Sequence, residues 1–238
     1  MIDFDKIWVE KYRPAKLDDI ILDERTLNIV KEFKNEIPNL LFVGNPGTGK
    51  TTLARIIVND ILKCNYLYIN ASDESGIDTI RHNITNFAQT KSFDGKVKVV
   101  ILDEADGLTG QAQAALRNTM ESFAKYCRFI LTANYKHKII PALQSRCQSL
   151  DLKPVIDQAV KRCYNILKTE QVNISDEQKK KFVQLVKRFF PDLRKTINEI
   201  QKAVIDSELC ISNTGTCLLY TSDAADDSLR VDLGGRRI

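Results

Sequence analysis

The 238-residue chain is 43% hydrophobic and 28% charged, which is typical of a folded globular protein with room for an α/β core and a smaller second unit. Its formal net charge of +4 permits contact with nucleic acid but does not establish it. The charged N-terminus, the lack of a long apolar run and six cysteines without a CxxC pair lead us to expect no signal peptide, membrane span, zinc site or disulfide framework.

From residue 40 onward, short apolar stretches alternate with helical periodicities. The expected strands are 40–43, 66–70, 97–102, 127–134 and 147–152. The expected helices lie near 50–62, 77–90, 110–123 and 138–145. This alternation indicates βαβ crossovers, and therefore a five-stranded parallel sheet covered by helices on both faces.

After residue 152 the strand pattern stops and three amphipathic helical patterns follow. The third of them includes Leu193, Ile197, Ile200 and Val204. Ser175 followed by Gln178 predicts a capping box at the start of the second helix. We therefore expect an α/β domain over 1–152 and an all-helical lid domain over 153–208.

The segment 209–238 is expected to be a tail outside the fold. From about Gly215 it has neither helical nor strand periodicity, and it is similar to a translated sequencing-adapter or vector read-through. A natural disordered terminus is the alternative. Either way, the segment does not enter the fold argument.

The stretch GNPGTGKTT follows a predicted strand and opens a predicted helix, and it matches G-x-x-x-x-G-K-[ST]. Its glycines let consecutive backbone N–H groups and a helix N-terminus converge on phosphate oxygens. Lys50 would reach the β and γ phosphates, and the Thr51 hydroxyl would ligate Mg²⁺. The expected phosphate-binding residues are Gly44, Asn45, Pro46, Gly47, Thr48, Gly49, Lys50, Thr51 and Thr52.

Acidic residues follow the predicted central strand in VVILDEAD. Asp103 is placed to hold Mg²⁺, and Glu104 to orient and activate a water for attack on the γ-phosphate. The next strand ends in TAN, so Asn134 would lie beside this acidic strand end and could sense the γ-phosphate. These residues together predict an Mg-dependent ATP hydrolase.

Six motifs occur in order along the chain: WVEKYRP, GNPGTGKTT, NASDESGIDTIR, ILDEADGLTGQAQAALRNTME, LTAN and LQSRCQSL. With these motifs, residues 7 to about 207 resemble the AAA+ ATPase subunits of sliding-clamp loaders. They are similar to the small subunits of replication factor C, and most similar to the tailed-phage clamp-loader ATPase subunit. The family has a third, helical collar domain, and here the tail begins where that domain is expected.

The resemblance implies roles for further residues. Arg146 of the SRC motif would reach, in trans, the ATP held by an adjacent subunit. Arg194 would contact the γ-phosphate of its own subunit's ATP. Asn70 would restrain Glu104 until DNA binds, and Arg117 would couple DNA contact to the ATP site. The segment Tyr12, Arg13 and Pro14 would pack against the adenine.

The expected partners are the other subunits of a ring of about five, a sliding clamp and primer-template DNA, with no membrane contact. DNA phosphates would meet the starts of two helices, where Thr79, Arg81, Thr109 and Gln113 are the candidate contacts. The expected location is the cytoplasm, or the host-cell cytoplasm for a viral chain. The alternative functions are another AAA+ DNA motor, of Holliday-junction or origin-binding type, and a structural subunit that binds nucleotide without hydrolysing it.

Overall fold

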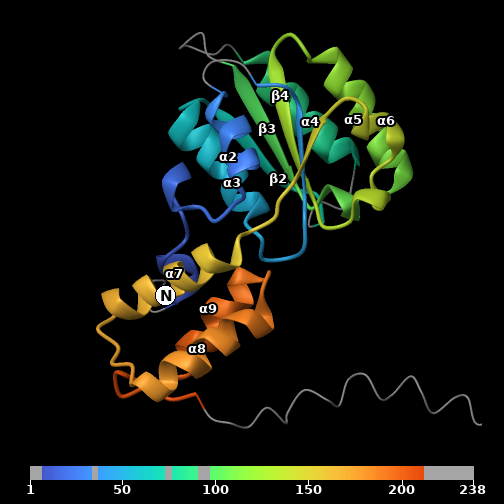
Figure 1. Cartoon of the computed structure of the whole chain (residues 1–238). Helices are drawn as coiled ribbons and strands as arrows, with labels where there is room; N and C mark the ends of the chain where they lie inside the picture. The colour runs from blue at the N-terminus through green and yellow to red at the C-terminus, as the bar shows by residue number, and fades with distance from the viewer. Residues whose placement is uncertain (1–6, 34–36, 73–76, 91–96, 212–238) are drawn as a thin grey trace, which may run out of the picture.

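The computed structural model describes residues 7–33, 37–72, 77–90 and 97–211. Within these ranges a sheet unit is followed by a helical unit that lies at one end of the sheet (Figure 1). No helix of the described part of the chain is both long and apolar enough to span a membrane. Most of the expected tail lies outside the described residues.

The sheet has five strands, all paired in parallel in the order β2-β3-β4-β1-β5. Their bounds are Leu40–Val43 (β1), Tyr66–Asn70 (β2), Lys98–Asp103 (β3), Cys127–Ala133 (β4) and Gln148–Asp151 (β5). Every residue of β3 is buried, as its continuous apolar sequence predicts for a central strand. The predicted five-stranded parallel sheet is confirmed.

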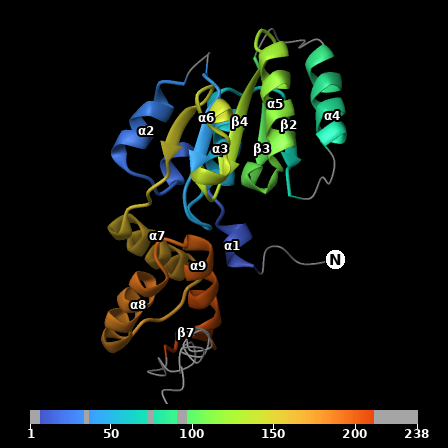
Figure 2. The same cartoon turned by 90° about the vertical axis from the view of Figure 1, so that its right-hand side faces the viewer.

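Helices cover both faces of the sheet (Figure 2). On one face lie α2 (Glu24–Lys31) and α3 (Lys50–Ile56), which continues as a π-helical turn over Ile57–Ile61. On the other face lie α4 (Ile77–Gln89), α5 (Gly110–Ser122) and α6 (Pro141–Gln144). Alternate side chains of β1 enter the two cores: Leu40 and Phe42 pack on the first face, and Leu41 and Val43 on the second.

The helical unit consists of α7 (Ile156–Thr169), α8 (Asp176–Phe189) and α9 (Leu193–Lys202). The short helix α1 (Trp8–Lys11), from the other end of the chain, also belongs to its core. Trp8 is buried among the lid side chains, and its backbone N–H donates to Gln201 Oε1 at 3.1 Å. The N-terminal segment thus bridges the two units and brings the following residues to their junction.

Three sequence expectations for this unit need correction. Helix α9 ends at Lys202, and Val204 instead begins a hairpin of β6 (Val204–Ile205) and β7 (Glu208–Leu209). The Ser175 side chain caps α8 as predicted, but Gln178 Oε1 accepts the N–H of Ile211. Leu209 is buried in the lid core, so the unit extends a few residues past 208.

Candidate functional site

A cavity of about 300 Å³ lies where the carboxyl ends of β1, β3 and β4 face the helical unit. Its lining includes the segment after α1, the loop between β1 and α3, the ends of β3 and β4, and the first turns of α9. Open parallel sheets bind ligands at this edge of their strands. The cavity contains the predicted residues Tyr12, Arg13, Pro14, Pro46, Gly47, Thr48, Gly49, Lys50, Thr51, Thr52, Asp103, Glu104, Asn134 and Arg194.

The loop before α3 depends on two glycines with left-handed backbones. Gly47 has φ of 75° and Gly49 has φ of 94°, and Gly49 forms the N-cap of α3. Residues other than glycine rarely adopt these backbone angles. The loop is closed from within by the Thr48 hydroxyl, which donates to Asn45 O at 2.9 Å. Gly44 and Asn45 lie at the base of the loop, outside the cavity lining.

Lys50 is nearly buried, at 8% exposure, and its ammonium group has three acceptors. It donates to Gly44 O and Asn45 O at 2.9 Å each, and to Asn134 Oδ1 at 2.7 Å. Burial lowers the pKa of Lys50, while the nearby carboxylates of Asp103 and Asp106 oppose this shift. The predicted phosphate-binding lysine and the predicted sensor are therefore in direct contact.

The carboxylate of Asp103 accepts hydrogen bonds from three hydroxyl groups. Thr51 Oγ1 lies 2.8 Å from both oxygens, Tyr68 OH donates to Oδ2 at 2.8 Å and Thr132 Oγ1 donates to Oδ1 at 2.5 Å. Burial raises the pKa of Tyr68 to about 12, and its hydrogen bond to Asp103 adds to the shift. A carboxylate beside a threonine hydroxyl supplies the oxygen ligands that Mg²⁺ prefers, so these residues fit the predicted metal.

Glu104 follows Asp103 with a left-handed backbone, φ of 54°, and its side chain is exposed. Its N–H donates to Thr132 Oγ1 at 3.0 Å. Its carboxylate accepts from the Ser72 hydroxyl, and that hydroxyl also lies 3.0 Å from Asn70 Oδ1. Ser72 thus connects the predicted regulatory Asn70 to the predicted catalytic Glu104.

The lid contacts the phosphate-binding loop directly. The N–H of Leu193, at the start of α9, donates to Gly47 O at 3.2 Å, and Asp192 caps this helix through the N–H of Lys195. Arg194 therefore lies at the cavity, on the first turn of a helix that begins at the loop. Tyr12 also lines the cavity, and its hydroxyl donates to Glu170 Oε1 at 2.5 Å.

Arg146 and Arg117 lie away from the cavity. Arg146 donates to Glu121 through Nε at 2.7 Å and through Nη2, and to Ala142 O through Nη1 at 2.9 Å. Arg117 donates to Asn118 Oδ1 at 2.7 Å. Arg146 therefore does not contact the phosphate-binding loop of its own chain. A role in trans requires its guanidinium to lie outside that cavity.

The structure contradicts one of the predicted DNA contacts. Gln113 is 2% exposed, and it joins α5 to the turn before α6 by donating to Lys138 O and accepting from Ile140 N. Thr109 is exposed at the start of α5, where its hydroxyl caps Ala112 N, and Arg81 is exposed on α4. The side chain of Thr79 lies outside the described residues.

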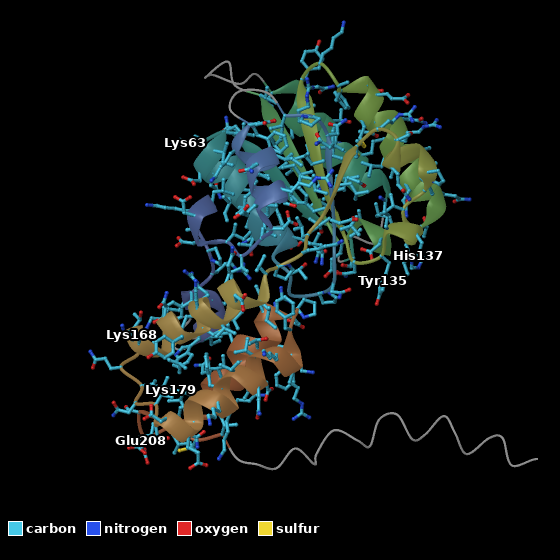
Figure 3. The ribbon with its side chains drawn as sticks, in the orientation of Figure 1. Lys63, Tyr135, His137, Lys168, Lys179 and Glu208 are labelled. Atoms are coloured by element: carbon cyan, nitrogen blue, oxygen red, sulfur yellow. The ribbon has the colours of Figure 1, made fainter. Side chains whose placement is uncertain are left out.

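Several residues at the site were not predicted from the sequence, namely Tyr68, Ser72, Asp106 and Thr132. Strand alternation offered a signal for two of them. Tyr68 precedes Asn70 by two residues on β2, so the two side chains share a face. Thr132 precedes Asn134 by two residues at the end of β4, and Asn134 is the first residue after that strand. Beyond β4, Tyr135 and His137 lie on the outer surface with ring centroids 5.6 Å apart (Figure 3).

The fold and the site together define a P-loop ATPase with a helical lid. Residues 40–155 match the family described as "ATPase family associated with various cellular activities (AAA)". Residues 151–209 match "sliding-clamp-loader large subunit, AAA+ ATPase lid domain". The chain is thus an AAA+ ATPase subunit of clamp-loader type.

Similar proteins of known family assign the chain to one group within this class of ATPases. The chain is 42% identical to the replication factor C small subunit of Archaeoglobus fulgidus, over 88% of its own length and 67% of the relative's. It is 46% identical to that of Methanoregula boonei, over 84% of its own length and 63% of the relative's. The chain belongs to the replication factor C small-subunit family. It spans about two thirds of the length of these relatives.

Solved structures with a similar fold include the Holliday junction branch migration motor RuvB of Thermotoga maritima. The TM-score is 0.64 at 20% identity, and the match covers 81% of this chain and 64% of that one. At this identity the similarity concerns the fold alone.

Proposed function

We propose that the chain binds and hydrolyses Mg-ATP as one subunit of a sliding-clamp loader, and that this cycle opens a ring-shaped clamp and closes it around primer-template DNA. The observation that carries the proposal is the convergence on one cavity of Lys50, the Thr51–Asp103 pair, Glu104, Asn134 and Arg194. Phosphoryl transfer depends on positioning and on charge neutralisation, which is what these residue types supply.

Each residue has a defined task in this proposal. Lys50 exchanges its loop acceptors for phosphate oxygens, and Thr51 and Asp103 hold Mg²⁺, which would neutralise phosphate charge. Glu104, at the exposed end of the site, accepts a proton from the attacking water. Asn134 and Arg194 contact the γ-phosphate from the sheet and from the lid.

In this proposal, a further positive charge at the γ-phosphate comes from Arg146 of an adjacent subunit. The guanidinium of Arg146 is exposed at the flank of the sheet unit and is held there by Glu121. In a ring of subunits this flank would face the nucleotide of a neighbour, and an arginine delivered in this way makes hydrolysis depend on assembly. The proposal requires the Arg146 guanidinium to be held in place outside the nucleotide cavity of its own chain. Its hydrogen bonds to Glu121 and Ala142 O support this.

The partners that follow are other clamp-loader subunits, the sliding clamp and primed DNA. DNA phosphates would meet the exposed Arg81 and Thr109, whereas Gln113 takes no part. We also propose the cytoplasm as the location, and a closer kinship with tailed-phage subunits than with cellular ones.

Phosphate release from ATP tests the proposal. The chain is assembled with its neighbouring subunits, and the clamp and a primer-template DNA are added. We expect strong stimulation over the basal rate, and loss of that stimulation in Arg146→Ala. Lys125→Ala, which removes an exposed cation just past the end of α5, is the matched control and should retain it. Stimulation that survives in Arg146→Ala would contradict the trans role, and a parent assembly without ATP hydrolysis would contradict the function.

A further inference from the structure

Asp106 is an acidic residue next to the site, and the proposed reaction assigns it no role. It lies in η4 (Ala105–Gly107), the short turn after β3. The left-handed backbone of Glu104 starts this turn, and the N–H of Gly107 closes it by donating to Glu104 O at 2.8 Å. The turn reverses the chain and brings Asp106 to the end of the neighbouring strand β4.

At the end of β4, one oxygen of Asp106 accepts two backbone N–H groups. Asp106 Oδ2 lies 3.2 Å from the N–H nitrogens of both Asn134 and Tyr135, the first residues after the paired part of the strand. A carboxylate that accepts from backbone N–H groups makes a stronger bond than a neutral acceptor does. These contacts fix the direction in which the backbone leaves the sheet.

The side chain of Asn134 extends from this fixed backbone to the phosphate-binding lysine, with Oδ1 2.7 Å from Lys50 Nζ. Asp106 therefore connects to the phosphate site through Asn134, without itself lining the cavity. Its second oxygen, Oδ1, is buried and has no hydrogen-bond partner among the described residues. A buried carboxylate oxygen without a partner is costly, so its presence calls for a compensating role.

We propose that Asp106 is a positioning residue, which holds the end of β4 so that Asn134 points at the γ-phosphate and distinguishes ATP from ADP. The proposal rests on the nucleotide site proposed above. It adds a residue that acts through the sensor and does not touch the substrate.

The test measures binding and does not need hydrolysis. The readout is the ratio of the dissociation constants for ADP and for a non-hydrolysable ATP analogue, each with Mg²⁺, on the full chain. We expect Asn134→Ala to lower the preference for the ATP analogue about tenfold or more, since it removes a hydrogen bond to a charged group. Asp106→Ala should lower it by a similar factor, with ADP affinity nearly unchanged.

Three further variants separate positioning from charge and from stability. Asp106→Asn keeps an oxygen for the two N–H groups and should retain the parent preference. Asp106→Glu keeps the charge but displaces the carboxylate, so it should lose the preference even if Asp106→Ala fails to fold. Asp23→Ala is the matched control, because Asp23 also accepts a backbone N–H, at 2.6 Å from Thr26 N, but does not line the cavity and does not contact Asn134. It should leave the ratio unchanged.

A double variant completes the test. If Asp106 acts through Asn134, Asp106→Ala combined with Asn134→Ala should have the same ratio as Asn134→Ala alone. The inference is overturned if Asp106→Ala or Asp106→Glu keeps the parent ratio, if Asp106→Asn loses it, or if the two alanine effects multiply. A parent chain that discriminates as expected but never hydrolyses ATP in the assembly would instead contradict the proposed function alone.

Discussion

The contact between Asp192 of the lid and Gly47 of the phosphate-binding loop predicts a large cost for the substitution Gly47→Ala. A Cβ atom built at Gly47 would lie 1.9 Å from Asp192 Oδ1 and 2.6 Å from its Cγ. Gly47 also has a left-handed φ of 75°. The substitution therefore combines backbone strain with a collision that only a movement of Asp192 can relieve.

The two effects can be estimated separately. A left-handed backbone at alanine costs about 1–2 kcal/mol. Displacing Asp192 removes the cap of α9, worth about 0.5–2 kcal/mol, and weakens the bond from Leu193 N–H to Gly47 O, worth about 0.5–1.5 kcal/mol. We expect Gly47→Ala to lower the free energy of unfolding by about 2–5 kcal/mol, measured by urea denaturation.

Two controls isolate the collision. In an Asp192→Ala background the carboxylate is absent, so Gly47→Ala should cost only the strain, about 1–2 kcal/mol. Gly49→Ala should also cost about that much, because Gly49 has φ of 94° but its added Cβ would meet Ile20 at an ordinary 3.6 Å. An equal cost of Gly47→Ala in both backgrounds would refute the proposed contact between the lid and the loop.

Two further predictions concern the strand ends and the N-terminal segment. Thr132→Val should lower the free energy of unfolding by about 1–3 kcal/mol in urea, since it leaves the N–H of Glu104 without its acceptor; Thr132→Ser should not, and equal losses would contradict the reasoning. Hydrogen bonds from Lys11 and Tyr12 lower the pKa of Glu170, so its stabilising effect is present above the ordinary carboxyl range and is lost as the pH falls through the lowered pKa. Melting temperatures at decreasing pH should therefore fall more steeply for the parent than for Glu170→Gln, and parallel curves would exclude the contribution.

Much of the sheet unit could be predicted because its local signals agree. Three local patterns indicate the same arrangement: the continuous apolar run of β3, the glycine loop before α3 and the acidic pair after β3. Together they predict that Lys50 and Asp103 lie at one edge of a sheet, as the structure shows.

The parts that could not be predicted depend on contacts between distant segments. Periodicity continued α9 through Val204, but the hairpin with Glu208–Leu209 ends the helix first. Gln113 is a polar residue near a helix start, which suggested an exposed DNA contact. The turn before α6 buries it and uses its amide group. Asp106 gave no signal either, because its partners are backbone N–H groups at the end of another strand.

The central claim is that the nucleotide held by one chain is hydrolysed with a guanidinium from the next. Mixing two inactive chains tests it most directly. Glu104→Gln should bind ATP and keep Arg146 but fail to hydrolyse, and Arg146→Ala should keep Glu104 but lack the cation. Assembled together with clamp and primed DNA, the two should restore ATP hydrolysis at the sites where an intact Glu104 meets a neighbour's Arg146. A mixture as inactive as either chain alone would contradict the account.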